Sequence, residues 1–158
     1  MIIHPHPRRS VLYVPGSNPR AIERARSLPV DCVVLDLEDS VAPEAKDAAR
    51  AQVRDAVAAG GFGGREVIVR INSLDVLWWL DDVNAVAPAK PDALLLPKVS
   101  SPDHLKHLAD RLIDMSTDQR VRVWGMMETP LAILNAQTIA GRRQGRLDAA
   151  CRLRDGHE

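Results

Sequence analysis

The 158-residue sequence has little cysteine, no net charge and no long apolar run. Its two cysteines, Cys32 and Cys151, provide neither a disulfide framework nor the paired spacing of a zinc site. Cys32 lies in an apolar segment and is expected to be a small buried hydrophobic residue. The scarcity of cysteine fits a reducing compartment, and we expect a cytoplasmic protein.

The formal net charge of zero suggests neither a nucleic-acid partner nor a membrane-surface partner. No stretch approaches the roughly 20 apolar residues that a membrane span requires. The first seven residues contain no apolar core of a signal peptide, and Pro15 and Gly16 interrupt the short apolar run that follows Arg8 and Arg9. The apolar fraction of 46% is ordinary for a globular protein.

Short apolar segments alternate with amphipathic ones along the chain. The apolar segments predict strands at residues 10–14, 32–37, 66–71, 93–96 and 121–127. The periodicity between them predicts helices at 19–28, 43–59, 76–86, from 102 onwards and at 130–140. This alternation, without hairpin signals, is typical of an α/β fold with a parallel sheet and right-handed crossovers.

Two architectures satisfy that pattern, a doubly wound open sheet and a (β/α)₈ barrel. No Gly-x-Gly-x-x-Gly follows the first strand, which disfavours a dinucleotide-binding sheet. A complete barrel needs about 250 residues, so this chain would supply about five βα units of a partial TIM barrel.

The last part of the chain has a different character. A sixth strand is due within residues 141–158, but no apolar run of strand length is found there, and only 147–150 resembles its beginning. We therefore predict a partial barrel domain over residues 1–140, followed by an aberrant or disordered tail over residues 141–158.

Charged side chains stand at the ends of four predicted strands. Because the carboxyl ends of parallel strands meet at one edge, where such folds bind ligands, the pattern predicts an enzyme active site. The residues concerned are Asp36, Glu38, Asp39, Arg70, Lys98 and Glu128.

The types of these residues suit cation and anion chemistry. Glu128 can coordinate Mg²⁺ or, alternatively, act as an acid favoured by the next helix dipole. The Arg70 guanidinium suits a carboxylate or an enolate oxygen, and its alternative is a salt bridge to Asp36, Glu38 or Glu128. Lys98 can anchor an anion, form a Schiff base or make a structural ion pair.

Asp36 and Glu38 point the same way by strand alternation. With Asp39 they can hold a cation or an arginine, or raise one pKa. The alternative is that they cap the loop and helix that follow.

Five short motifs in order resemble the citrate lyase beta-subunit-like group of the HpcH/HpaI aldolase superfamily. They are Ser-Val-Leu-Tyr-Val-Pro-Gly-Ser (10–17), Leu-Asp-Leu-Glu-Asp-Ser-Val (35–41), Val-Arg-Ile-Asn (69–72), Leu-Pro-Lys (96–98) and Met-Glu-Thr-Pro (127–130). Pro43, Lys46 and Arg50 also fit the family pattern. The resemblance covers about residues 8–140.

The resemblance implies a TIM barrel that usually forms trimers or hexamers. It also implies Mg²⁺-dependent cleavage or formation of a carbon–carbon bond in 3-hydroxyacyl thioesters such as citryl-, malyl- or citramalyl-CoA. Glu128 would be the metal ligand, and Glu128 and Arg70 would be catalytic and bind the substrate. Glu38, Asp39 and Lys98 would line the substrate site.

The sequence departs from the family after Ala149. The family supplies a second metal-binding aspartate at the end of strand six, and the segment around Asp155 does not match that motif. We hypothesise a truncated or frameshifted lyase with impaired activity. The alternatives are a non-catalytic fragment or pseudoenzyme that binds a partner subunit or an acyl thioester, and a different phosphate- or enolpyruvate-binding barrel in which Lys98 matters more than Glu128.

Overall fold

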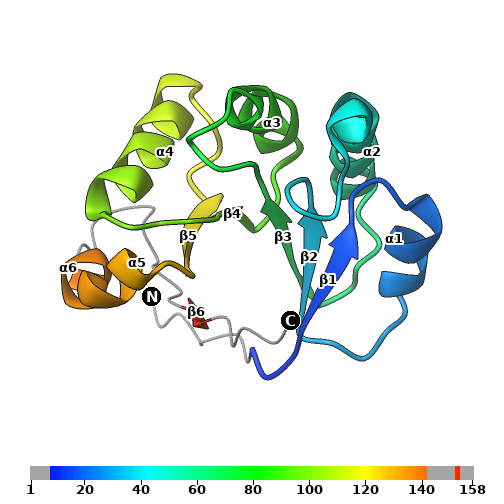
Figure 1. Ribbon diagram of the computed structural model, residues 1–158. Helices are drawn as coiled ribbons and strands as arrows, with labels where there is room; N and C mark the ends of the chain where they lie inside the picture. The colour runs from blue at the N-terminus through cyan, green and yellow to red at the C-terminus, as the bar shows by residue number, and fades with distance from the viewer. Residues whose placement is uncertain (1–7, 142–151, 154–158) are drawn as a thin grey trace.

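The computed structural model describes residues 8–141 and 152–153, and their strands form one parallel sheet in the sequential order β1-β2-β3-β4-β5-β6 (Figure 1). A doubly wound sheet reverses its strand order at a switch point, whereas barrel strands follow one another in chain order. The prediction of a partial TIM barrel is therefore confirmed. The strands are β1 (Val11–Pro15), β2 (Cys32–Asp36), β3 (Glu66–Arg70), β4 (Ala93–Leu96), β5 (Arg122–Met127) and β6 (Arg152–Leu153).

Helices α1 to α4 lie along one side of the curved sheet (Figure 1). The α-helices are α1 (Pro19–Ala25), α2 (Lys46–Ala59), α3 (Trp78–Val86), α4 (Pro102–Asp114), α5 (Pro130–Leu134) and α6 (Ala136–Gly141), and the 3₁₀ helices are η1 (Pro43–Ala45) and η2 (Ala87–Ala89). All predicted helices are present, but the one expected over 130–140 is divided at Asn135. The Asn135 side chain donates a hydrogen bond to the Ser100 carbonyl at 2.9 Å, and its backbone leaves the helical region.

The two faces of the sheet have different partners. Residues such as Val33, Leu35 and Val69 join the helices in the main hydrophobic core. Their sequence neighbours point to the other face and form a second, smaller cluster that comprises Cys32, Val34, Ile68, Ala93, Leu95, Trp124 and Met126. The register pairs Asp36 with Arg70, so these two charged residues lie on adjacent strands at the same level, on the face of the smaller cluster.

The turn after β1 approaches β2 closely. The Gly16 amide donates a hydrogen bond to the Asp36 carbonyl at 2.8 Å, and a Cβ atom at Gly16 would lie 2.6 Å from that oxygen. Asn18 then begins α1, because its side chain accepts a hydrogen bond from the Ala21 amide at 3.0 Å, and Pro19 occupies the first turn. Only glycine permits this approach to the end of β2.

The expectation that no sixth strand would form is wrong. Arg152 and Leu153 form β6, which pairs in parallel with Met126 and Met127 of β5. A strand of two residues is too short to produce the apolar run that the sequence prediction sought. Residues 147–150, where its beginning was expected, lie outside the described residues.

None of the helices in the part of the chain that the structure describes is long and apolar enough to cross a membrane.

Candidate functional site

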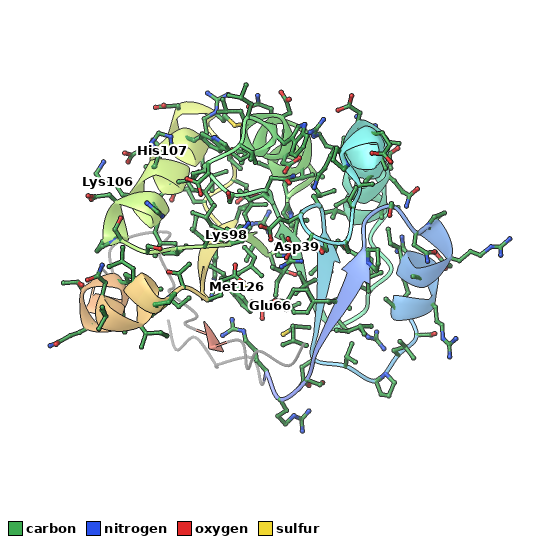
Figure 2. All side chains as sticks on the ribbon, viewed as in Figure 1. Asp39, Glu66, Lys98, Lys106, His107 and Met126 are labelled. Atoms are coloured by element: carbon green, nitrogen blue, oxygen red, sulfur yellow. The ribbon has the colours of Figure 1, made fainter. Side chains whose placement is uncertain are left out.

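The charged residues predicted at the strand ends converge at the carboxyl end of the sheet. Asp36 and Arg70 are the last residues of β2 and β3, and Lys98 and Glu128 follow β4 and β5. Asp39 and Lys98, labelled in Figure 2, belong to this group, whereas Glu66 begins β3 at the opposite end. The parallel arrangement therefore brings together side chains that are far apart in the sequence.

Arg70 and Asp36 form a buried, bidentate ion pair. Arg70 donates from Nε to Asp36 Oδ1 at 2.7 Å and from Nη2 to Oδ2 at 2.6 Å, and the two residues are 4% and 2% exposed. Burial opposes ionisation of Asp36, but the hydrogen bonds and the charge of Arg70 outweigh it and lower the pKa of Asp36. The Ser40 hydroxyl donates to Asp36 at 2.6 Å, which fixes the carboxylate further.

Two further carboxylates complete the surroundings of Arg70. Its Nη1 lies 3.2 Å from Glu38 Oε2 and 3.4 Å from Asp39 Oδ2, and its Cζ lies 5.4 Å from the centre of the Tyr13 ring. Two of the three predicted ion-pair partners, Asp36 and Glu38, thus contact Arg70. The Asp39 side chain is 55% exposed and makes the longest of these contacts, so it is the partner that an incoming anion displaces most easily.

Lys98 lies between two carboxylates. Its Nζ is 3.1 Å from Glu38 Oε1, and its backbone amide donates to Glu128 Oε1 at 3.0 Å. Burial raises the pKa of Glu38, although Arg70 and Lys98 both favour the ionised form. The hydrogen bond with Glu38 raises the pKa of Lys98. The ion pair proposed as one alternative for Lys98 is therefore present.

A buried network of hydrogen bonds connects the end of β2 to helices α2 and α3. Lys46 of α2 donates from Nζ to the carbonyls of Leu37 and Glu38, both at 2.7 Å, and to Asn72 Oδ1 at 2.8 Å. Asp82 of α3 accepts from the Asn72 amide at 2.8 Å and from Arg50 Nε at 3.0 Å. The network fixes the peptide that carries Glu38.

The sequence pattern indicates no role for Lys46 and Arg50, and it did not reveal Asp82. Asp82 shares one buried helix face with Trp79, Val83 and Val86. A carboxylate on an otherwise apolar face was the available signal, because such a group requires a buried partner.

Glu128 is the side chain that best fits a metal ligand. It is partly buried, follows β5 directly and offers hard oxygen atoms of the kind that Mg²⁺ prefers. The carboxylates of Asp36, Glu38, Asp39 and Glu128 outnumber the cations Arg70 and Lys98 in this cluster, so a divalent cation would balance the charge. Within residues 8–141 and 152–153, no group of three or more His, Cys, Asp or Glu side chains is arranged to hold a metal ion. Glu128 could supply one oxygen ligand to such an ion.

The chain resembles known proteins over most of its length. Residues 9–151 match the family model described as HpcH/HpaI aldolase/citrate lyase. The chain belongs to this family. It is 46% identical over 135 residues to a (3S)-malyl-CoA thioesterase from Cereibacter sphaeroides, covering 85% of this chain and 45% of that protein. It is 34% identical over 139 residues to the human mitochondrial citramalyl-CoA lyase, covering 84% of this chain and 41% of that protein.

A solved structure shows the same fold. The citrate lyase beta subunit from M. tuberculosis, complexed with oxaloacetate and magnesium, superposes with a TM-score of 0.71 at 27% identity. The alignment covers 90% of this chain and 56% of that chain. The present chain thus spans about half the length of the relatives it matches, and the resemblance predicted from its motifs is confirmed.

Proposed function

We propose that the site carries out Mg²⁺-dependent carbon–carbon cleavage of a 3-hydroxyacyl thioester such as malyl-, citramalyl- or citryl-CoA. One observation carries this proposal. Arg70 and Glu128 lie at the carboxyl end of the sheet in a cluster where carboxylates outnumber cations. The human relative is named as a citramalyl-CoA lyase, and the M. tuberculosis relative holds oxaloacetate and magnesium.

Arg70 and Glu128 have separate roles in such a reaction. In the cleavage, the hydroxyl group loses its proton and becomes the carbonyl of the 2-oxo acid as the bond to the carbon next to the thioester breaks. The electron pair of that bond forms an enolate, which then takes up a proton to give the shorter acyl thioester. Glu128 would hold Mg²⁺, which when bound polarises the oxygens of the 2-oxo acid. Arg70 would donate from Nη1 to a substrate oxygen after Asp39 moves aside, and this charge-assisted hydrogen bond stabilises developing negative charge.

Glu128 is the one carboxylate among the described residues that we assign to the metal, so we propose that this chain cleaves thioesters weakly. Family members with the complete ligand set would bind Mg²⁺ more tightly. The alternative of a non-catalytic binder of an acyl thioester or of a partner subunit follows from the same shortage of ligands.

A second candidate function is hydrolysis of the thioester, favoured by the 46% identity to a malyl-CoA thioesterase. The two reactions share a substrate and a need to stabilise an oxyanion, but they break different bonds. Cleavage of malyl-CoA gives glyoxylate and acetyl-CoA, whereas hydrolysis consumes water and gives malate and free CoA.

A product assay with malyl-CoA tests the proposal. We expect glyoxylate and acetyl-CoA to form slowly with Mg²⁺, to stop forming with EDTA, and to be absent with Glu128→Gln. Malate and free CoA would identify the thioesterase instead, and the absence of either product pair would favour the non-catalytic binder. Cleavage that persists in EDTA or in Glu128→Gln would contradict the proposed role of Glu128.

A further inference from the structure

The loop after β4 contains a backbone conformation that lysine rarely adopts. Three non-glycine residues in the described part of the chain have positive φ, namely Lys90, Lys98 and Ser116. Lys90 and Ser116 follow the ends of η2 and α4, where a left-handed residue commonly terminates a helix. Lys98, with φ of 54°, follows a strand at the candidate site, and no helix end accounts for it.

The positive φ of Lys98 lies between two hydrogen bonds to the segment of β5. The Lys98 amide donates to Glu128 Oε1 at 3.0 Å. The next backbone amide, that of Val99, donates a hydrogen bond to the Met126 carbonyl of β5 at 3.1 Å. The unusual conformation therefore lies at a residue whose amide contacts the proposed metal ligand, Glu128.

Neighbouring polar contacts hold this loop against the segment that carries Glu128. The hydroxyls of Ser100 and Thr129 are 2.9 Å apart, and Asn135 donates to the Ser100 carbonyl at 2.9 Å. Thr129 follows Glu128 directly and caps α5 by accepting from the Ala132 amide at 3.1 Å. Both sides of the Lys98–Glu128 hydrogen bond are thus fixed by other contacts.

We infer that Lys98 is a positioning residue that orients the Glu128 carboxylate through its backbone amide, while its ammonium group serves Glu38 separately. A hydrogen bond to one carboxylate oxygen limits rotation of the side chain, as the partners behind metal ligands commonly do. This inference rests on the proposed role of Glu128. The sequence predicted a role for the Lys98 side chain, whereas the inference gives a role to its backbone amide.

Two substitutions separate the backbone role from the charge. Lys98→Ala removes the ammonium group but keeps the Cβ atom and tolerates the same φ. Lys98→Val also removes the charge, but its β-branched side chain strongly disfavours positive φ. If the backbone matters, Lys98→Val is expected to disturb Glu128 and Lys98→Ala is not.

Hydrogen exchange of the residue 98 amide tests the inference without a metal. We expect slow exchange in the native chain and in Lys98→Ala, and exchange at least about tenfold faster in Glu128→Ala and Lys98→Val. Equal exchange rates in the native chain and Glu128→Ala would overturn the inference, because the amide would then be protected without the carboxylate.

A Mn²⁺ titration followed by electron paramagnetic resonance provides the second readout. We expect Lys98→Ala to bind Mn²⁺ at least as tightly as the native chain, because it removes a positive charge from the site, and Lys98→Val to bind Mn²⁺ about tenfold or more weakly than Lys98→Ala. Equal weakening by both substitutions would assign the effect to the ammonium group and overturn the inference. Failure of the native chain to bind Mn²⁺ would instead contradict the proposed function, while the exchange rates would still decide the positioning role.

Discussion

Replacing Arg70 with methionine is expected to destabilise the chain by about 3–5 kcal/mol in urea denaturation, because it leaves the Asp36 charge buried without its partner. Both members of the pair are almost fully buried, and two of the hydrogen bonds to Asp36 come from Arg70. Glu38 and Asp39 would lose the same cation, which adds to the repulsion between the carboxylates.

Arg9 offers a matched control. Its guanidinium also contacts a single aspartate through two nitrogen atoms, Asp31 at 3.1 and 2.8 Å, but the arginine side chain is 80% exposed. Arg9→Met should therefore cost much less than Arg70→Met, because the Asp31 carboxylate keeps its hydrogen bonds from the backbone amides of Arg9 and Ser10. Equal costs for the Arg9 and Arg70 substitutions would contradict the account of the buried pair.

The double substitution Arg70→Met with Asp36→Leu should recover much of the lost stability, because neither charge then remains buried alone. The double variant also tests the acid dependence. The pKa of Asp36 is below its ordinary value of 3.8, so its contribution to stability is present above that pH and is lost as the pH falls below it. The stability of the native chain should decline more steeply below pH 4 than that of the double variant.

Lys46→Met should destabilise the chain by about 2–4 kcal/mol, since buried oxygen atoms lose a charged donor. Asn72 Oδ1 loses the ammonium group, and the carbonyls of Leu37 and Glu38 keep only neutral donors, the Asn72 side-chain amide and the Val41 backbone amide. Lys46 is 5% exposed and donates to three oxygens, and burial lowers its pKa. Methionine preserves the apolar stem and the approximate volume, so the loss measures the polar contacts. Urea denaturation at neutral pH provides the measurement.

The control for Lys46 is Lys106→Met on the outer surface of α4. The Lys106 side chain is 55% exposed and pairs with Asp110 one helical turn away, an interaction worth about 0.5 kcal/mol or less. A small cost at Lys46, comparable to that at Lys106, would show that the network behind Glu38 contributes little to the fold.

The strands could be predicted because buried parallel strands appear in the sequence as uninterrupted apolar runs. The edge of the sheet at which the charged residues meet followed from the strands. The strand at residues 93–96 matched its prediction, and the one expected at 121–127 begins one residue later. Once a parallel sheet was predicted, the positions of Arg70 and Glu128 at strand ends implied that they would share one edge.

The sequence could not decide which of the alternative contacts form within that edge, because each depends on register or on backbone angles. The pairing of Arg70 with Asp36 follows from the register of two strands, which the sequence leaves open. The positive φ of Lys98 has no signal in a Leu-Pro-Lys segment. The network of Lys46, Asn72 and Asp82 joins three separate elements, so no local pattern reveals it.

Mg²⁺-dependent binding of pyruvate, followed by saturation-transfer NMR, tests the central claim most directly. Pyruvate represents the 2-oxo acid product and does not require the chain to complete a reaction. We expect the native chain, and the control Glu23→Gln on the exposed surface of α1, to bind pyruvate with Mg²⁺ and not with EDTA. We expect Glu128→Gln to bind it in neither condition. Pyruvate binding by Glu128→Gln equal to that of the native chain would contradict the assignment of this site.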